Sequence, residues 1–412
     1  NGVCLKEYSK KRFEFTGIVD ERGAIEASRN LVETSVKRRL LSDVPLGCFL
    51  SSGLDSSIIA TIAAKELDEL STYTIGFEDV DDPYHGKADE SKMVEEYVRK
   101  LGTKHRTIRV TADDFKNNLE LFTCHGDQPF AVSSGLGILS VAEAAKQDGI
   151  KVLLSGDGAD EAFGGYSWYQ HLNKMNGFRA DLSQSNNGHY SMQYVNMPLR
   201  ELLKRLESYS PSDRAWAWHY YASEKDKAEL FSVEPFAEIE SSHSHFHSYK
   251  NGNDWTPEEY IHQDRLFYFP NEMLRKMDRM TMAHSVEGRV PFAAPSILSF
   301  ADRLNYGQMV RGKTLKWTLR QAFKDILPFE VVHRPKHGFN VPIDHWLKGR
   351  WSEMVDEAFA PSSALSRMKL IRKGSWARAK QMLNDPVRLT GHTIFCYIQL
   401  NRWLEQTESV MV

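Results

Sequence analysis

The sequence has no long apolar run, no excess of basic residues and no signal-peptide core, and each absence excludes a class of protein. No stretch approaches the roughly 18 apolar residues of a membrane-spanning helix, so we expect no membrane anchor. The 412 residues include 52 basic and 55 acidic ones, which is too little positive charge for a dedicated nucleic-acid-binding protein. The N-terminal residues lack the apolar core of a signal peptide, so we expect a cytoplasmic location.

Several familiar site motifs are also missing. The four cysteines form no CxxC pair, which argues against a disulfide framework or a structural zinc site. The histidines of HSHFH (residues 243–247) stand among polar residues, which favours a solvated loop over a metal site. The sequence has no GxxxxGK[ST], no GxSxG, no HExxH and no GxGxxG after a predicted strand. These absences argue against ordinary phosphate-loop enzymes, α/β-hydrolases, zincin proteases and dinucleotide oxidoreductases.

The first third of the chain alternates short apolar runs with helical periodicity, which is typical of a parallel α/β sheet. Strands are predicted at residues 44–50, 72–77, 107–110 and 150–154, and helices follow the first two strands and occupy residues 135–147. After about residue 166 the strand signals disappear and amphipathic helices follow. We therefore predict an N-terminal segment (1–30), an α/β domain with a parallel twisted sheet (31–175) and a mostly helical C-terminal region (176–412).

Residues 50–57 (LSSGLDSS) carry the first chemical signal. A strand ends there, small residues turn the chain, and a helix begins with Asp55, Ser56 and Ser57 in its first turn. Backbone N–H groups and hydroxyls then converge at the positive end of a helix, which suits phosphate oxygens. The alternative is a capped helix start without a ligand.

Residues 152–166 (VLLSGDGADEAFGGY) repeat the order of strand, glycine turn and helix, with Asp157, Asp160 and Glu161 close together. Taken singly, such an acidic residue could simply cap a helix. However, ligands of open α/β sheets bind at the carboxyl edge, where the two turns would meet. Asp55 and Asp160 could then jointly hold Mg²⁺ against a triphosphate, because Mg²⁺ favours few carboxylates plus phosphate oxygens.

Together these segments resemble the synthetase domain of glutamine-dependent asparagine synthetases, whose usual motifs are SGGLDSS and SG[ED]G[SA]DE. The resemblance extends in order to DQPF (127–130), KMDRMTMAHSVEGRVPF (276–292) and RPKHGF (334–339), and covers most of the chain from about residue 25. It implies an adenine nucleotide α-hydrolase-like fold, with helices on both faces of the sheet. It also implies an AMP-forming carbon–nitrogen ligase. ATP would adenylate a carboxylate, by expectation the aspartate side chain, and ammonia would then displace AMP to give asparagine.

The resemblance also assigns residues to the site. The cradle of the leaving pyrophosphate would comprise Ser51, Gly53, Asp55, Ser56 and Ser57, with Asp55 and Asp160 binding Mg²⁺. Further nucleotide contacts would come from Phe49, Leu50, Ile75, Ser155 and Gly156. Asp157 would be a base for the incoming amine, and Lys336 would face the phosphates and the transition-state oxyanion. Alone, Lys336 could be a solvated loop lysine. Asp278, Glu287 and Arg289 could shape the acceptor pocket, with Glu287 in a catalytic role, or form an internal ion-pair network.

The sequence departs from the family pattern at several positions. Ser52 replaces the first glycine of the usual pair, and a serine adopts positive φ far less readily than glycine does. Val132 and the pair Ala293–Ala294 stand where many members carry an acidic residue. The phosphate, Mg²⁺ and lysine positions are kept, so we expect adenylation to survive. The acceptor could still differ, as in β-lactam synthetases or peptide cyclases.

The family's glutaminase half uses an N-terminal cysteine nucleophile, and Cys4 is neither terminal nor in such a context. We therefore expect this chain not to hydrolyse glutamine by that route. A glutaminase domain could have been removed or be a separate partner, or the amine could have another source. Two further classes are a pyrophosphate-loop protein acting on tRNA and a non-catalytic scaffold. The near-neutral charge argues against the first, and the retained Asp55, Asp160 and Lys336 argue against the second.

Overall fold

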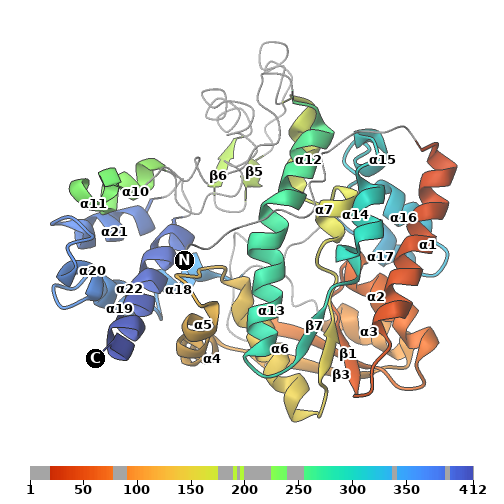
Figure 1. Cartoon of the computed structure of the whole chain (residues 1–412), viewed down its shortest axis with the longest axis horizontal. Helices are drawn as coiled ribbons and strands as arrows, with labels where there is room; N and C mark the ends of the chain where they lie inside the picture. Colours follow the sequence, from red (N-terminus) through yellow and green to blue (C-terminus); the bar gives the residue numbers. More distant parts are fainter. Residues whose placement is uncertain are drawn as a thin grey trace, which may run out of the picture.

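The computed structural model describes residues 19–77, 91–174, 189–192, 195–198, 224–238, 255–335, 341–385 and 390–411. Its centre is a five-stranded parallel sheet in the order β3-β2-β1-β4-β7, which confirms the predicted α/β fold (Figure 1). The strands are β1 Leu46–Phe49, β2 Ser71–Phe77, β3 Lys104–Val110, β4 Val152–Leu154 and β7 Glu287–Arg289, and a separate antiparallel pair is β5 His189–Met192 with β6 Val195–Pro198. All four predicted strands are therefore present.

Helices cover both faces of the sheet. On one face, α2 (Leu54–Glu66) contacts β1 and α3 (Ser91–Leu101) contacts β2 and β3. On the other, α6 (Ser134–Gln147) lies against β2 and β3 and packs on α13 (Arg275–Met282), which contacts β7. Side chains alternate accordingly, because Cys48 and Leu154 join the core on the α2 side while Leu153 joins a smaller core with Val141 of α6.

The remaining helical elements surround this centre. Around the sheet they are α1 Glu21–Arg39, α7 Ala159–Phe163, η1 Ser167–Lys174, α12 Pro257–Leu266, η3 Phe269–Leu274, η4 Pro291–Ala293, α14 Pro295–Ala301, α15 Tyr306–Met309, α16 Trp317–Phe323 and α17 Phe329–His333. Toward the other end of the molecule they are α4 Ala112–Asn117, α5 Leu119–Gly126, α10 Glu224–Leu230, α11 Val233–Glu238, α18 Ile343–Lys348, α19 Ser352–Ala358, α20 Ala364–Arg367, α21 Ser375–Leu383 and α22 Gly391–Met411. None of the helices described here is long and apolar enough to cross a membrane.

The expectation that no strand follows residue 166 is wrong, because β5 and β6 lie beyond it and so does β7. This strand pairs with β4 in parallel, with Val152 opposite Glu287 and Leu154 opposite Arg289. It has only three residues, Glu-Gly-Arg, and none of them is a branched apolar residue. Neither the β-propensity nor the alternation that marks a strand is present, so pairing with β4 decides the conformation.

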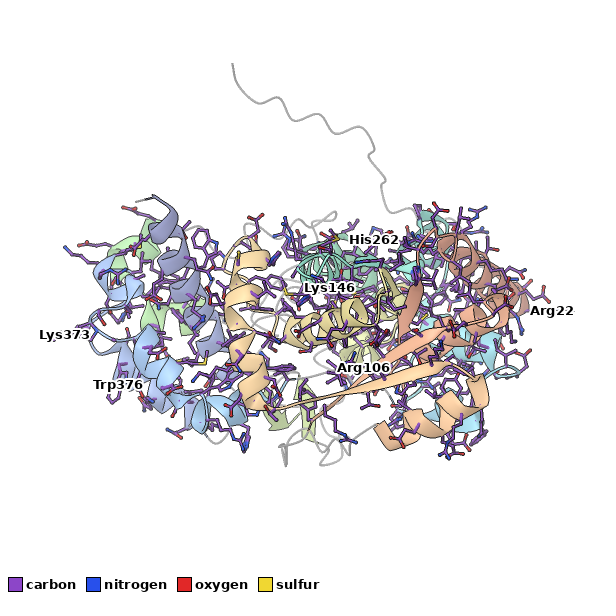
Figure 2. The ribbon with its side chains drawn as sticks, turned by 90° about the horizontal axis from the view of Figure 1, so that it is seen from below. Arg22, Arg106, Lys146, His262, Lys373 and Trp376 are labelled. Carbon is purple, nitrogen blue, oxygen red and sulfur yellow. The ribbon has the colours of Figure 1, made fainter. Side chains whose placement is uncertain are left out.

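Two large buried cores correspond to the two ends of the molecule. The first joins β1, β4 and α2 to α14 and α16, so residues from both sides of position 175 share it. The second joins α5 and α6 to α18, α19, α21 and α22. Figure 2 shows the same two ends from below, with Lys373 and Trp376 at one and Arg22 at the other. The expected boundary near residue 175 adjoins a segment outside the described residues.

Candidate active site

The two motif-bearing turns lie side by side at the carboxyl edge of the sheet. β1 and β4 are neighbours, with Cys48 opposite Leu154, so the segments that follow them emerge together. The chain proceeds from β1 outward through β2 to β3 on one side, and β4 lies on the other side. This is a topological switch point, where open α/β sheets form their ligand crevice.

The turn after β1 is closed by serine hydroxyls. The Ser56 hydroxyl accepts a hydrogen bond from the Ser51 backbone N–H at 3.0 Å and lies 2.9 Å from the Ser51 hydroxyl. The Gly53 N–H donates to the Ser51 hydroxyl at 3.1 Å. Gly53 occupies the N-cap position of α2 and offers no side-chain cap. The turn is therefore not an ordinary side-chain-capped helix start.

Ser52 occupies its position without left-handed strain. Among the residues that the structure describes, non-glycine residues with positive φ are Asp127, Ser285, Lys316 and Lys369. Ser52 is not one of them, and it is buried. The replacement of the usual glycine is therefore compatible with this turn.

The turn after β4 packs directly on the first turn. A Cβ on Gly156 would lie 2.9 Å from the Asp55 Cβ and 3.1 Å from the Ser56 nitrogen. A larger residue at 156 would therefore push the turns apart. The Ser155 hydroxyl donates to the Asp157 carboxylate at 2.5 Å, and the Ser155 N–H donates to the Arg289 carbonyl of β7 at 2.9 Å.

The two predicted metal-binding carboxylates converge on Lys316, a residue that sequence reasoning missed. The Lys316 Nζ lies 2.5 Å from Asp55 Oδ2 and 2.7 Å from Asp160 Oδ1. The Lys316 side chain is 3% exposed and each carboxylate 15% exposed. A signal was available in the sequence. Lys316 stands directly before helix α16, where the helix dipole disfavours a cation, so such a lysine needs another partner.

The backbone around Lys316 fixes this arrangement. Lys316 is the N-cap of α16 and adopts a left-handed conformation, with φ 53° and ψ 40°. Its N–H donates to the Gly164 carbonyl at 3.2 Å, and its carbonyl accepts from the Arg320 N–H at 2.9 Å. A Cβ on Gly165 would overlap both the Lys316 side chain and the Asp160 carboxylate. The lysine therefore reaches the carboxylates through space that only a glycine at 165 leaves open.

The pair Asp55 and Asp160 fits a divalent cation by its donor chemistry. Both carboxylates are aimed at the same positive charge, and two carboxylates leave room for phosphate oxygens and water, as Mg²⁺ prefers. Within the described part of the chain, no group of three or more His, Cys, Asp or Glu residues is arranged to hold a metal. The donor set is thus suited to a metal that arrives with a phosphate.

Glu161 belongs to a buried polar network with Tyr166 and Arg265. Its side chain accepts a hydrogen bond from the Tyr166 hydroxyl at 2.6 Å, and its carbonyl accepts from Arg265 at 3.1 Å. Burial, with a smaller contribution from the neighbouring Asp160, raises the pKa of Glu161 to about 8. Of the three clustered acidic residues, Glu161 therefore joins α7 to its buried neighbours Tyr166 and Arg265.

Asp157 lies beside a buried lysine of α13. The Lys276 Nζ is 3.7 Å from Asp157 Oδ1, and Lys276 is 8% exposed. The same helix contacts the DQPF segment, since Arg275 donates to the Gln128 side chain at 2.5 Å and Arg279 pairs with Asp127 at 3.2 Å. The segments 127–130 and 276–292, which are distant in sequence, thus meet at this site.

Glu287 forms an ion pair within its own strand. Its carboxylate lies 2.7 Å from Arg289, which also donates to the carbonyls of Arg39 and Leu41. The Arg289 side chain holds the pKa of Glu287 below its usual value through this hydrogen bond. This contact matches the ion-pair alternative. The catalytic role of Glu287 stays a prediction.

Lys336 falls outside the described residues, but the backbone that leads to it is anchored beside the carboxylate pair. Arg320 of α16 donates to the Leu315 carbonyl at 2.7 Å and to the Arg334 carbonyl at 3.0 Å. Burial lowers the pKa of Arg320, and Asp55 and Asp160 act in the opposite direction. One guanidinium therefore connects the segment before Lys316 with the segment before Lys336.

The predicted adenine-binding positions lie at the same edge. The Leu50 N–H donates to the Tyr73 carbonyl at 2.8 Å, and Phe49 is the last β1 residue in register with β2, opposite Tyr73. β2 continues to Phe77, so Ile75 lies beyond the end of β1. The backbone of β2 near Ile75 therefore forms one wall of the edge at which the two turns emerge.

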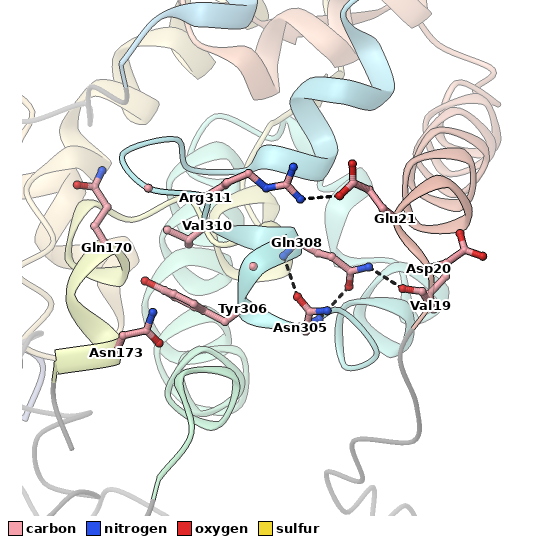
Figure 3. Close-up of a pocket in the computed structure, with 12 residues that line it drawn as sticks. Val19, Asp20, Glu21, Gln170, Asn173, Asn305, Tyr306, Gln308, Val310 and Arg311 are labelled. Carbon is pink, nitrogen blue, oxygen red and sulfur yellow. Dashed lines mark hydrogen bonds and ion pairs between the residues drawn. The ribbon is translucent and has the colours of Figure 1, made fainter. Parts of the chain in front are cut away.

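A separate hollow lies beside α1 and α15 (Figure 3). Its volume is about 570 Å³, and none of the predicted site residues lines it. Its polar groups bond to one another, since Gln308 donates to the Val19 carbonyl at 2.6 Å and Arg311 pairs with Glu21 at 2.6 Å. The site is thus built from the two turns rather than from this hollow.

A family of known proteins matches most of this chain. The family model "Asparagine synthase" matches residues 27–405. The chain belongs to the asparagine synthase family. The match includes both turns, Lys316 and the RPKHGF segment.

Several relatives within this family cover most of the chain. A Mycobacterium bovis protein assigned as a glutamine-hydrolysing asparagine synthetase is 32% identical over 338 residues, which are 80% of this chain and 50% of that protein. Glutamine-hydrolysing asparagine synthetase 1 of Bacillus subtilis is 29% identical over 371 residues, which are 86% of this chain and 55% of that protein. This member of the asparagine synthase family thus spans about half the length of the curated relatives it matches. Among solved structures, NMN synthetase from Francisella tularensis matches with 12% identity and a TM-score of 0.25, over 65% of this chain and 93% of that chain.

Proposed function

We propose that this chain is an ATP-dependent, amide-forming synthetase that activates a carboxylate as an acyl-adenylate and transfers it to ammonia. The proposed acceptor is the side chain of aspartate, which would give asparagine, AMP and pyrophosphate. One observation supports this most directly. The β1 and β4 turns, a hydroxyl-lined helix start and a carboxylate-bearing helix start, meet at one point of the sheet edge.

The first step needs a cradle for a leaving pyrophosphate. A carboxylate oxygen attacks the α-phosphorus of ATP, the bond from that phosphorus to the bridging oxygen breaks, and pyrophosphate leaves. The proposed cradle is the N-terminus of α2 with the hydroxyls of Ser51, Ser56 and Ser57 and the backbone of Gly53, whose N–H donates to the Ser51 hydroxyl in the structure. Asp55 and Asp160 would hold Mg²⁺, which when bound neutralises charge on the phosphates.

The nucleotide would lie along the ends of β1, β2 and β4. The backbones of Phe49, Leu50 and Ile75 would contact the adenine, and Ser155 and Gly156 would contact the nucleotide from the β4 side. With the nucleotide placed in this way, the proposed base Asp157 would follow the two nucleotide-contacting residues Ser155 and Gly156 in the same turn.

The second step needs a base for the amine and a cation for the oxyanion. Ammonia attacks the acyl carbon, AMP leaves, and the attacking nitrogen loses a proton. Asp157, held by Ser155 and 3.7 Å from Lys276, is the proposed proton acceptor. Lys336 is the proposed cation for the developing oxyanion. Glu287 is the proposed acceptor-pocket residue, although Arg289 holds its carboxylate in the structure.

The choice of acceptor is the part of the proposal that most needs a test. Val132 is buried in an apolar cluster and Ala294 is also buried, at positions where many family members carry an acidic residue. A related enzyme that forms an amide or lactam on another carboxylate is therefore the alternative. ATP–pyrophosphate exchange should be measured with aspartate and with a panel of other amino-acid and β-amino-acid carboxylates. Exchange with aspartate alone supports the proposal. Exchange with another acid alone would identify that acid, in place of aspartate, as the carboxylate that is adenylated.

The nitrogen source is tested separately. The purified 412-residue chain should form amide from ammonium at alkaline pH and none from glutamine alone. A glutaminase, either elsewhere on a longer chain or as a separate partner in the cytoplasm, would then supply ammonia. Glutamine-driven synthesis by the purified chain would contradict this assignment.

A further inference from the structure

The buried ammonium of Lys316 occupies the point on which the two predicted metal ligands converge. Its Nζ lies 2.5 Å from Asp55 and 2.7 Å from Asp160, which are hydrogen-bonding distances to both. A divalent cation held by the same carboxylate oxygens needs the same space. The lysine and the metal therefore exclude each other from this position.

The lysine is held there by more than its side chain. Its backbone is fixed between Gly164 and Arg320, and the absence of a side chain at Gly165 opens the path of its methylene groups. The surroundings shield the ion pairs from water, since the Lys316 side chain is 3% exposed. In such a poorly screened site, charges of like sign repel strongly, so a divalent cation cannot simply bind beside the ammonium.

We propose that Lys316 is an internal counter-cation that keeps free Mg²⁺ away from Asp55 and Asp160, so that the metal enters together with a triphosphate. The phosphate oxygens offer Lys316 a new anionic partner at the adjacent turn while the metal takes its place between the carboxylates. Lys316 is thus a positioning residue that sets the order of binding. The proposal rests on the proposed function only in taking ATP as the triphosphate.

The decisive experiment uses Mn²⁺ and no nucleotide. Mn²⁺ binding to the full chain is measured by electron paramagnetic resonance and by calorimetry for the wild type, Lys316→Met and Lys316→Gln. The matched control is Lys313→Met, which removes the same charge from an exposed lysine three residues away. We expect the Lys316 variants to bind Mn²⁺ at least tenfold more tightly than the wild type, and Lys313→Met to stay within twofold of it.

A double variant identifies the site. Asp55→Asn combined with Lys316→Met should lose the gained affinity, because one of the two ligands is gone. Equal or weaker Mn²⁺ binding in both Lys316 variants would overturn the proposal, as would a gain that survives in the double variant. Since no nucleotide or acceptor is present, these outcomes do not depend on whether the chain adenylates aspartate.

The wild-type chain provides a second readout if the Lys316 variants do not fold. Saturating Mn²⁺ must expel the ammonium from between the carboxylates, so Lys316 should become more reactive toward an amine-acylating reagent. Peptide mass spectrometry should show at least a threefold rise in labelling of Lys316 relative to Lys313. Unchanged labelling at saturating Mn²⁺ would contradict competition between the lysine and the metal.

Discussion

Gly165 and Lys316 are mutually dependent, because a Cβ at position 165 would overlap the methylene chain that carries the Lys316 ammonium to Asp55 and Asp160. Position 165 does not need glycine for its backbone, since Gly165 is not among the described glycines with positive φ. The requirement is spatial. It follows directly that a single methyl group should disturb the carboxylate pair.

Gly165→Ala should therefore lower both ATP–pyrophosphate exchange and thermal stability. The added methyl must displace either Lys316 or Asp160, and a buried charge that loses its partner is costly, about 3–5 kcal/mol. Gly307→Ala is the matched control. Its Cβ would meet its nearest neighbour, the Asn305 side chain, at an ordinary 3.4 Å, and alanine is the better helix former. Wild-type exchange in Gly165→Ala would contradict the placement of Lys316.

Asp55→Asn and Asp160→Asn should each reduce exchange strongly while the fold persists. Each carboxylate makes its own contact with the Lys316 ammonium. A metal held by the same two carboxylates would likewise need both of them. We expect a loss of at least about 10²-fold, the size typical of one lost electrostatic contact in a transition state. The remaining carboxylate still pairs with Lys316, so circular dichroism should show an intact fold. Near-wild-type exchange in both variants would exclude these residues as metal ligands.

Lys336→Ala should reduce the rate of adenylate formation more than the affinity for ATP, because a cation near the reacting centre acts mainly on the transition state. One lost oxyanion contact typically costs about 10²–10³ in rate. Lys336→Arg should rescue poorly, since a planar guanidinium differs in shape from a compact ammonium. Single-turnover assays measure both variants, with Lys313→Ala as the control. Rates within threefold of the wild type would identify Lys336 as a solvated loop residue.

Cys48 should resist alkylation in the folded chain, whereas Cys124 should react. Burial raises the pKa of the Cys48 thiol to about 12, while Cys124 is exposed. Because the thiolate is the nucleophile, Cys48 should stay unlabelled by iodoacetamide at pH 8. Between pH 9 and 12 the unfolded chain loses this proton first, so the contribution of Cys48 to stability declines as pH rises. Mass spectrometry of both peptides is the measurement, and equal labelling would contradict the burial.

The strands and turns that bear the motifs were predictable because their signals are local. An apolar run followed by small residues marks the end of β1, and the same pattern with glycines marks the end of β4. Their meeting at one edge followed from the parallel arrangement, which the register of Cys48 with Leu154 confirms.

The position of Lys316 before a helix marks it as a lysine that needs a partner, but its partner Asp55 lies 261 residues earlier, so only the folded chain identifies the pair. β7 was missed because three residues without branched apolar side chains carry no strand signal. The contact of Lys276 with Asp157 likewise depends on how α13 packs against α6, which is a tertiary property.

The late position of β7 and Lys316 has a consequence for how the protein is made. When the ribosome has completed α7, the nascent chain contains Asp55 and Asp160, but not yet the strand that borders β4 or the lysine that pairs with both carboxylates. A sheet without that edge strand exposes an unpaired side to other chains. Domains generally fold as units during synthesis, so we expect the domain that contains this sheet to complete its folding only after α16 has emerged. A fragment that ends near residue 175 should therefore accumulate as aggregate rather than as a small nucleotide-binding domain.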